Sequence, residues 1–213
     1  MESYLSRWSD DKEFVKLYEQ FNNLYDLNNK IDTALYARLY VLRQLADQQK
    51  DKNLNFAECG VYAGMSMLFT ADKCTQKFIG IDSFEGVSPK TEFDTDYFDK
   101  VTLEIEMKYS LLTLQEFNNT EIYKGWIPDV FNQIGVLEYS YVHLDVDMYE
   151  PTRDSLEYFW DKICIGGVLI CDDYGSYKTI GARKAMDDFF PRSSILEIPT
   201  GQAIVFKRSI NGR

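Results

Sequence analysis

The stretch FAECGVYAG, residues 56–64, decides the fold, because an apolar strand pattern runs directly into a glycine-rich turn and then into the helical sequence MSMLFTADKC. Gly60 permits a tight turn and close approach of a ligand, and the following helix N-terminus offers free backbone N–H groups. The stretch lacks the dinucleotide fingerprint GxGxxG, and Glu58 lies two residues before the first glycine. Such an acid suits an ammonium or sulfonium ligand better than a diphosphate. The alternative is an ordinary strand–helix turn.

Outward from this stretch, short apolar runs alternate with helical patterns. This alternation predicts an α/β fold, a mostly parallel seven-stranded sheet with helices on both faces. The 213 residues fit a single domain, in which residues 1–50 form an N-terminal helical segment. The expected strands are Asn55–Cys59, Phe78–Asp82, Glu121–Lys124, Tyr141–Asp145, Val168–Cys171, Ile195–Ile198 and Ala203–Phe206. The expected helices lie within 11–49 and at 64–75, 108–118, 151–163 and 177–190.

Composition excludes several classes of function. The net charge of −11 lacks the basic footprint of a nucleic-acid binder, whereas it is compatible with a cationic ligand or a metal ion. No apolar run reaches the ~20 residues of a membrane helix. The N-terminus does not resemble a signal peptide, so we expect a cytoplasmic protein with no membrane partner. A single histidine argues against a His/Cys zinc site.

Polar side chains follow the predicted strands at their carboxyl ends, which is where ligands bind in open parallel sheets. Asp82 ends the strand FIGID, a position from which a carboxylate holds the hydroxyls of a nucleoside ribose in such folds. The alternative is that Asp82 or Ser83 caps a helix. Together with the glycine turn at 60–64, the pattern favours ribose binding.

A second group of carboxylates points to a metal ion. The stretch GGVLICDDYG, residues 166–175, reads as a strand buried on both faces that ends in Asp172 and Asp173. Asp145 can converge with them if the two strands are neighbours. Three carboxylates in a small volume repel unless a cation lies among them, and an oxygen-only set selects a hard ion, Mg²⁺ before Ca²⁺ or Mn²⁺. The alternative is helix capping with salt bridges to Arg153, Lys178 or Arg183.

Three neighbouring features leave alternative roles open. Asp147 shares a strand face with Asp145, so it either supports the metal ligands or contacts the substrate. His143 lies inside the strand, where a structural role is favoured over that of a general base. The acidic and aromatic residues 86–110 form either a solvated connection or a lid over the site.

Taken in order, the motifs ECGVYAG, DSFEG, KGWIPDV, LDVDMYEPT and GGVLICDDYG resemble the macrocin/mycinamicin/novobiocin-type sugar O-methyltransferases over most of residues 55–190. These are class I S-adenosylmethionine (SAM) enzymes that use Mg²⁺. The resemblance therefore implies a Rossmann-like class I methyltransferase fold, SAM as cofactor and a homo-oligomer. The glycine motif and the Asp then Asp-Asp arrangement are also similar to catechol-type O-methyltransferases.

The resemblance also implies a role for each matching position. The cofactor-binding residues would be Glu58, Gly60 and Gly64 at the methionine end of SAM, Asp82 at the ribose with Ser83 and Phe84 beside it, Lys124, Gly125 and Trp126 on the adenine side, and also Tyr62. The metal ligands would be Asp145, Asp172 and Asp173.

The expected reaction is methyl transfer to a hydroxyl of a small molecule, for which the resemblance favours a glycoside. A vicinal diol would chelate Mg²⁺, and Asp145 or Asp147 would accept the hydroxyl proton. Two alternatives stay open at this point. One is a metal-independent class I methyltransferase, and the other is a non-catalytic module that binds SAM or a nucleoside.

Overall fold

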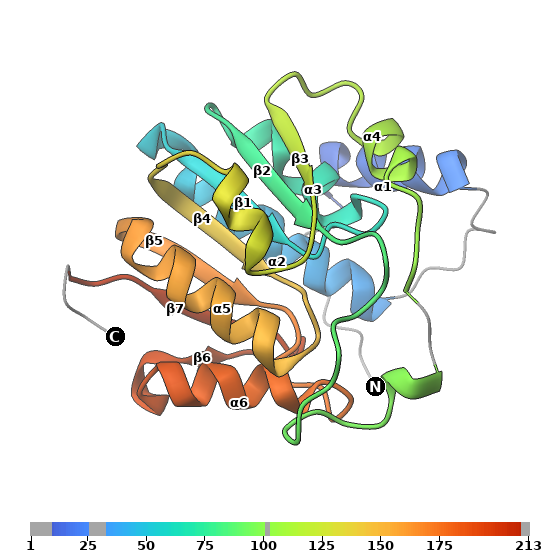
Figure 1. The fold of residues 1–213 in the computed structure, drawn as a ribbon. Helices are drawn as coiled ribbons and strands as arrows, with labels where there is room; N and C mark the ends of the chain where they lie inside the picture. The colour runs from blue at the N-terminus through green and yellow to red at the C-terminus, as the bar shows by residue number, and fades with distance from the viewer. Residues whose placement is uncertain (1–9, 26–32, 101–102, 210–213) are drawn as a thin grey trace, which may run out of the picture.

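The computed structural model describes residues 10–25, 33–100 and 103–209, in which a central sheet lies between two layers of helices (Figure 1). The helices are α1 (Lys12–Tyr25), α2 (Thr33–Gln49), α3 (Met65–Thr70), α4 (Lys108–Thr113), α5 (Tyr149–Phe159) and α6 (Ile180–Phe189). The strands are β1 (Asn55–Cys59), β2 (Phe78–Asp82), β3 (Thr120–Lys124), β4 (Tyr139–Leu144), β5 (Ile163–Cys171), β6 (Leu196–Glu197) and β7 (Ala203–Phe206).

The strand order β3-β2-β1-β4-β5-β7-β6 determines where a ligand can bind. The strands β1 to β5 pair in parallel, and β7 pairs antiparallel with β5 and β6. The chain moves outward from β1 to β3, then returns to place β4 on the other side of β1. The connections therefore diverge between β1 and β4, and the crevice at their carboxyl ends is the expected binding position of such a sheet.

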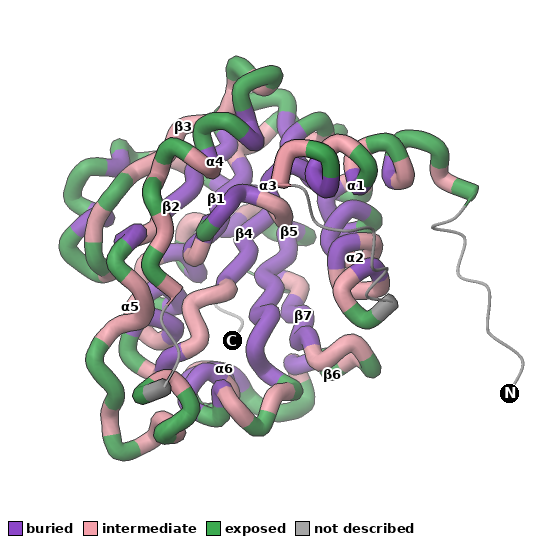
Figure 2. The backbone as a smooth tube through the Cα atoms, turned by 90° about the vertical axis from the view of Figure 1, so that its right-hand side faces the viewer, coloured by how far each residue is buried: buried purple, intermediate pink, exposed green. Residues whose placement is uncertain are grey.

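Each face of the sheet packs against its own helices. The α1, α2 and α3 side buries Phe14, Leu42 and Phe69, and the α5 and α6 side buries Leu156 and Met186. Figure 2 shows the buried strands between these two layers. The inner parallel strands β1, β2 and β4 are buried on both faces, which is why they read in the sequence as largely apolar runs, whereas β3 at the sheet edge is only half-buried.

The structure confirms the seven-stranded sheet and the expected bounds of β1, β2 and β7. The prediction for β5 was too short, because Gly166 and Gly167 interrupt the apolar pattern although the strand begins at Ile163. The prediction for β6 was too long, since only two residues pair there. The helices that follow β1 and β2, α3 and α4, are also shorter than the expected 64–75 and 108–118. Pro151 lies in the first turn of α5, as expected.

The segment after β2 has little regular structure, apart from a 3-10 helix at Phe98–Lys100. It runs from the carboxyl edge of the sheet toward the beginning of α6 (Figure 1). Part of the expected lid, residues 101–102, lies outside the described residues, as do residues 1–9 and 26–32 of the expected N-terminal helical segment.

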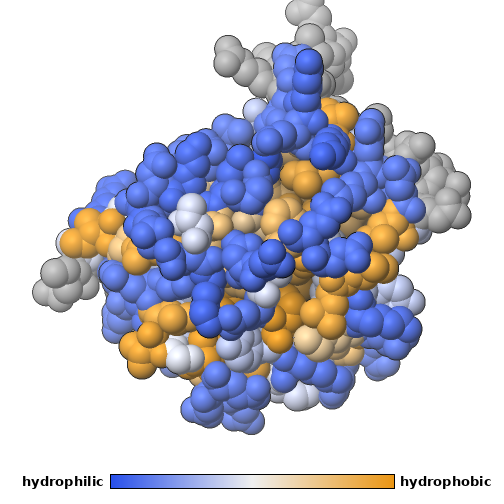
Figure 3. Space-filling view, turned by 90° about the horizontal axis from the view of Figure 1, so that it is seen from above, coloured by the Kyte–Doolittle hydropathy of each residue, from blue (hydrophilic) through white to orange (hydrophobic). Residues whose placement is uncertain are grey.

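The surface seen from above in Figure 3 is mostly hydrophilic, with smaller hydrophobic areas between. This agrees with a chain in which 27% of the residues are charged. In the described part of the chain, no helix is both long enough and apolar enough to cross a membrane.

Candidate active site

The glycine turn and the loop after β4 meet at the centre of the carboxyl edge. Gly60 has a φ of +88°, and a Cβ atom at this position would lie 1.8 Å from the carbonyl oxygen of Asp145. The Asp145 N–H donates to the carbonyl of Cys59 at 2.8 Å, and the Gly60 N–H donates to that of Ile81 at 2.8 Å. Only glycine satisfies both the backbone angle and the contact. The turn thus holds Asp145 against the end of β1.

A cavity of about 320 Å³ opens on the β2 and β3 side of this turn. Its walls include six of the ten residues expected at the cofactor: Gly60, Tyr62, Asp82, Ser83, Gly125 and Trp126. Their side chains and backbone come from three successive strand ends, which lie together only because the strands are parallel and adjacent. The cavity is therefore placed where the sequence predicts the nucleoside end of the cofactor.

Asp82 fixes the shape of the glycine turn. Its Oδ2 accepts hydrogen bonds from the N–H groups of Val61 and Tyr62, both at 2.8 Å, and its Oδ1 accepts one from Phe84 N–H at 2.6 Å. That Asp82 holds the glycine turn through these backbone N–H groups was not predicted from the sequence. A carboxylate offers about four lone-pair positions, so Oδ1 still has capacity for a ligand hydroxyl.

The other four expected cofactor residues do not form the walls of this cavity. Glu58 is fully buried against Ser66 and His143, which line the second cavity described below, and Lys124 pairs with Glu85 on the surface, with Nζ and Oε1 3.3 Å apart. Phe84 lines a small neighbouring hollow, and Gly64 precedes α3 with a φ of +84°.

A second, larger cavity of about 670 Å³ lies on the other side of Gly60, between the ends of β4 and β5 and the helices α1 and α2. Most of its wall is apolar or aromatic: Phe21, Tyr25, Leu35, Leu39, Leu42, Val61, Ala63, Met65, Ile105 and Tyr109. Its acidic end contains Asp145, Asp147, Asp172 and Asp173. The two cavities share Gly60, Tyr62, Asp145 and Asp147, so one ligand in each would meet at this junction.

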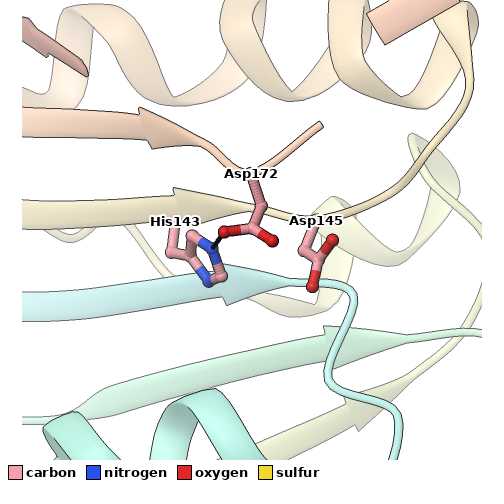
Figure 4. A group of neighbouring side chains, drawn as sticks. All are labelled: His143, Asp145 and Asp172. Atoms are coloured by element: carbon pink, nitrogen blue, oxygen red, sulfur yellow. Dashed lines mark ion pairs between the residues drawn. The ribbon is translucent and has the colours of Figure 1, made fainter. Parts of the chain in front are cut away.

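The ends of β4 and β5 bring His143, Asp145 and Asp172 together (Figure 4). One ligand atom from each lies within 4.8 Å of those of the other two, a spacing that can hold a metal ion. Asp172 Oδ1 is 3.4 Å from His143 Nε2, and Gln202 donates to the same oxygen at 2.7 Å. Asp145 and Asp172 thus converge as expected, whereas the third member of the group is His143 and not the expected Asp173, which lies in the same cavity wall.

Two further carboxylates crowd this cluster. The backbone N–H of Asp147 donates to Asp173 Oδ2 at 2.9 Å. Burial, and then the nearby Asp145 carboxylate, raise the pKa of Asp147 to about 7. Burial, Asp145 and Asp147 together raise the pKa of Asp173 well above its usual value. Without a cation, the cluster therefore retains protons that isolated carboxylates would have lost at neutral pH.

Arg38 of α2 supplies the positive charge that the structure places at these acids. Its guanidinium pairs with the Asp172 carboxylate, and its Nη2 donates to the Asp172 carbonyl at 3.0 Å. The alternative to a metal ion named Arg153, Lys178 or Arg183 as the pairing cation, and none of the three is seen to pair with these acids in the described residues. Instead, Arg153 pairs with Asp154, Lys178 donates to Tyr97, and Arg183 donates to the carbonyl of Tyr174.

Arg38 was not among the residues predicted for the site, although its spacing from two leucines indicates that it lies on the apolar face of a helix. It lies three residues after Leu35 and four before Leu42, and all three side chains line the second cavity. A cation in an apolar helical stripe needs a buried or partly buried counter-charge.

His143 and Glu58 form a buried polar layer under the acid cluster. Both are fully buried, with His143 Nδ1 3.0 Å from Glu58 Oε2, and Ser66 donates to Glu58 Oε1 at 2.6 Å. Burial raises the pKa of Glu58, while the hydrogen bonds from His143 and Ser66 oppose the rise. The expected structural role of His143 agrees with this placement. The His143 ring lies between Glu58 and Asp172, with Nδ1 toward Glu58 and Nε2 toward Asp172.

The sequence model of the macrocin O-methyltransferase (TylF) family matches residues 35–200, which contain both cavities' strand ends and the whole acid cluster. The chain belongs to this family. It is 25% identical over 158 residues to demethyldecarbamoylnovobiocin O-methyltransferase of Streptomyces niveus. It is 26% identical over 164 residues to 8-demethyl-8-(2,3-dimethoxy-alpha-L-rhamnosyl)-tetracenomycin-C 4'-O-methyltransferase of Streptomyces olivaceus.

These alignments cover 64% and 66% of this chain and 60% and 59% of the relatives, so the chain spans about three fifths of their length. Among solved structures, the O-methyltransferase NovP superposes with a TM-score of 0.68 at 19% identity, over 81% of this chain and 80% of NovP. CalS11, a calicheamicin methyltransferase, superposes with a TM-score of 0.62 at 17% identity, over 92% of this chain and 93% of CalS11. The neighbours confirm the methyltransferase fold.

Proposed function

We propose that this protein transfers the methyl group of SAM to a hydroxyl of a glycoside, with a divalent cation at the acid cluster. The observation that carries the proposal is the junction of the two cavities at Gly60, Tyr62, Asp145 and Asp147. SAM in the first cavity and an acceptor in the second would bring a methyl group and a hydroxyl to the same acidic wall. Membership of the TylF family supports the same reaction, and a structural neighbour, TomG, is described in complex with SAM.

The donor chemistry of the cluster fits a hard cation. Asp145 and Asp172, which lie with His143 in a group that can hold a metal ion, offer carboxylate oxygens, the ligands that Mg²⁺ prefers, and Asp173 would add a third carboxylate. Burial, and after it the neighbouring carboxylates, raise the pKa values of Asp147 and Asp173, as expected for acids that lack a cation. Such an ion would lower the pKa of an acceptor hydroxyl. Arg38 already pairs with Asp172, so its guanidinium would have to yield that carboxylate.

The residues of the chain then have separate tasks. Asp82 and the first cavity would hold the nucleoside part of SAM, and the apolar wall of the second cavity would orient the acceptor. Asp147, which lies in the wall shared by both cavities, would accept the hydroxyl proton as the oxygen attacks the methyl carbon and the carbon–sulfur bond breaks. S-adenosylhomocysteine leaves as the neutral product. Alignment and exclusion of water would supply most of the acceleration, about 7–11 kcal/mol in well-oriented reactions.

The second cavity also favours a class of acceptor. Its wall is aromatic and aliphatic, its polar end is acidic, and among the described residues its only cation is Arg38, which is paired with Asp172. A phosphate group would meet carboxylates there, whereas an uncharged sugar on an apolar body would match both parts of the wall. We therefore propose a finished glycoside, rather than a nucleotide sugar, as acceptor.

Release of S-adenosylhomocysteine tests the proposal directly. Aryl glycosides with a vicinal diol, matched nucleotide sugars and catechols would be compared in Mg²⁺ and in EDTA. Turnover of the glycosides only in Mg²⁺ is the expected result. Turnover in EDTA would instead support a metal-independent methyltransferase. SAM binding without turnover of any acceptor would favour a binding module. The homo-oligomer and the cytoplasmic location stay predictions.

The stabilising effect of Mg²⁺ should depend on pH. The pKa of Asp147 is raised in the folded state, from an ordinary value near 3.8 to about 7, so the folded chain binds more protons than the unfolded chain in this window. The free energy of unfolding of the metal-free protein should therefore fall as the pH rises from the ordinary pKa of 3.8 to about 7. Mg²⁺ replaces these protons, so we expect it to raise the melting temperature more at about pH 8 than at about pH 5.5. Equal increments at both pH values would contradict a cation at the cluster.

Arg38 should compete with the metal ion. Arg38→Met keeps the aliphatic stem but leaves Asp172 without its cation, which should cost about 1–2 kcal/mol of metal-free stability, a value reduced for the partial exposure of Arg38. Because Mg²⁺ no longer displaces an arginine, its apparent Kd should fall about tenfold. Denaturant unfolding in EDTA and thermal titration with Mg²⁺ measure the two effects. Arg153→Met, which removes a cation away from the cluster, is the matched control.

A further inference from the structure

Residues 91–97, which we call the strap, lie against the beginnings of α5 and α6. The Phe93 and Tyr149 rings pack with centroids 4.6 Å apart. Thr95 Oγ1 donates to the carbonyl of Lys178 at 2.6 Å, and Lys178 Nζ donates to the Tyr97 hydroxyl at 3.1 Å. This part of the expected lid is therefore tied to the two helices that follow the acidic strand ends.

Asp94 connects the strap to the first residue of α5. Its Oδ1 accepts a hydrogen bond at 2.9 Å from the backbone N–H of Tyr149, the first residue of the helix. Met148 at the N-cap position supplies no side-chain cap of its own. The other oxygen, Oδ2, accepts from the N–H and the hydroxyl of Thr91, each at 2.8 Å, which holds the carboxylate in place. The helix thus receives its cap from a residue 55 positions earlier in the chain.

Gly181 of α6 makes room for this contact. A Cβ atom at position 181 would lie 1.8 Å from Asp94 Oδ1 and 3.0 Å from Tyr149 N. Any other residue there would displace the Asp94 carboxylate from the end of α5. The absence of a side chain at 181 and the carboxylate at 94 are two independent features that serve one contact.

The capped N–H lies two residues after Asp147, in a turn with little freedom. Asp147 has a φ of +61°, which is unfavourable for a residue other than glycine, and the Met148 N–H donates to the Val146 carbonyl at 2.6 Å. We propose that Asp94 is a positioning residue for Asp147: seated beside Gly181, its carboxylate couples the closed strap to the turn that orients Asp147 toward the acceptor. The role in turnover rests on the function proposed above.

The test compares Asp94→Ala and Gly181→Ala with Glu92→Ala, which removes an exposed carboxylate from the same strap. We expect both strap variants to lower kcat about 10–100-fold with little change in the KM for SAM, while Glu92→Ala behaves as wild type. Because both changes break one contact, the double variant should be no slower than Asp94→Ala. Asp94→Asn keeps an acceptor for the Tyr149 N–H, so it should retain more turnover than Asp94→Ala.

A second readout needs no turnover. Trypsin cleavage after Lys90, beside the strap, should be faster in Asp94→Ala and Gly181→Ala than in wild type and Glu92→Ala. Unchanged cleavage would overturn the strap contact. Faster cleavage with unchanged kcat, or fully additive losses in the double variant, would overturn the coupling to Asp147. Faster cleavage in a protein whose wild type turns over no acceptor would overturn the proposed function and the role in turnover with it, but would leave the strap contact in place.

Discussion

Replacing Asp173 by asparagine is expected to reduce turnover about a thousandfold while the affinity for SAM stays within about threefold. The substitution removes one negative charge from the acid cluster. An asparagine oxygen can still accept the hydrogen bond that Asp147 N–H donates to Asp173 Oδ2 at 2.9 Å. The loss would then report the charge at this position and not the shape of the Asp147 turn.

SAM binding should survive this substitution because Asp173 lines only the second cavity. The residues expected at the nucleoside, Asp82 among them, lie in the first cavity. Steady-state release of S-adenosylhomocysteine and calorimetric titration with SAM measure the two quantities separately. Asp161→Asn, an exposed aspartate between α5 and β5, is the control for loss of a charge. If SAM affinity collapsed with turnover, the division of tasks between the cavities would be wrong.

The same variant should lose the response to Mg²⁺. Asp173 has a strongly raised pKa because it is buried beside Asp145 and Asp147, so its removal relieves part of the repulsion within the cluster. We expect Asp173→Asn to be at least as stable as wild type in EDTA and to gain little melting temperature from Mg²⁺. A wild-type response to Mg²⁺ in this variant would remove Asp173 from the proposed ligands.

Gly60→Ala is expected to abolish measurable SAM binding and to destabilise the fold by about 3 kcal/mol or more. The added methyl group would lie 1.8 Å from the Asp145 carbonyl oxygen, and the φ of +88° is strained for any residue with a Cβ. The turn can accept alanine only by moving away from β4. That movement would break the hydrogen bonds of Gly60 N–H and Asp145 N–H and distort the wall shared by both cavities.

Chemical unfolding and SAM titration of the variant measure these effects, with circular dichroism to establish that the chain is folded. Gly135→Ala is the matched control, because a Cβ at position 135 would have nothing within 4 Å. The control should bind SAM as wild type does. Wild-type SAM affinity in Gly60→Ala would show that the turn does not contact the cofactor.

The local sequence was sufficient to predict a mostly parallel seven-stranded sheet with helices on both faces. Parallel strands buried on both faces need largely apolar runs, and such runs marked β1 and β2 to the residue. A short apolar run also marked the antiparallel strand β7. The pattern failed at β5, where two glycines interrupt the run but Ile163 still pairs with Tyr139, and Gly166 and Gly167 exchange backbone hydrogen bonds with Lys207. Pairing with neighbouring chain segments therefore extended β5 toward its N-terminus, beyond the point at which the local sequence predicted that the strand would begin.

The position of the site also followed from the sequence, since the carboxyl ends of parallel strands lie at one edge. This rule predicted that Asp145 would meet the Asp172–Asp173 pair, and that Asp82 would lie near the glycine turn. It could not predict which carboxylate oxygens are already bonded. Asp82 holds the turn through two N–H groups of the loop after β1, a contact that depends on the register of β1 against β2.

Only the tertiary structure decided the partners that come from distant helices and loops. Arg38 reaches Asp172 across 134 positions of the chain, and Asp94 reaches the end of α5 beside Gly181. Such pairs depend on where α2, α6 and the strap pack against the sheet edge, and packing is set by the summed fit of many apolar side chains. The sequence by itself thus determined the sheet and the edge that carries the acids. The packing of the helices and the strap determined that Arg38 pairs with Asp172 and that Asp94 caps α5. Sequence periodicity predicts which face of an element a residue lies on, but it does not predict which distant residue will contact it.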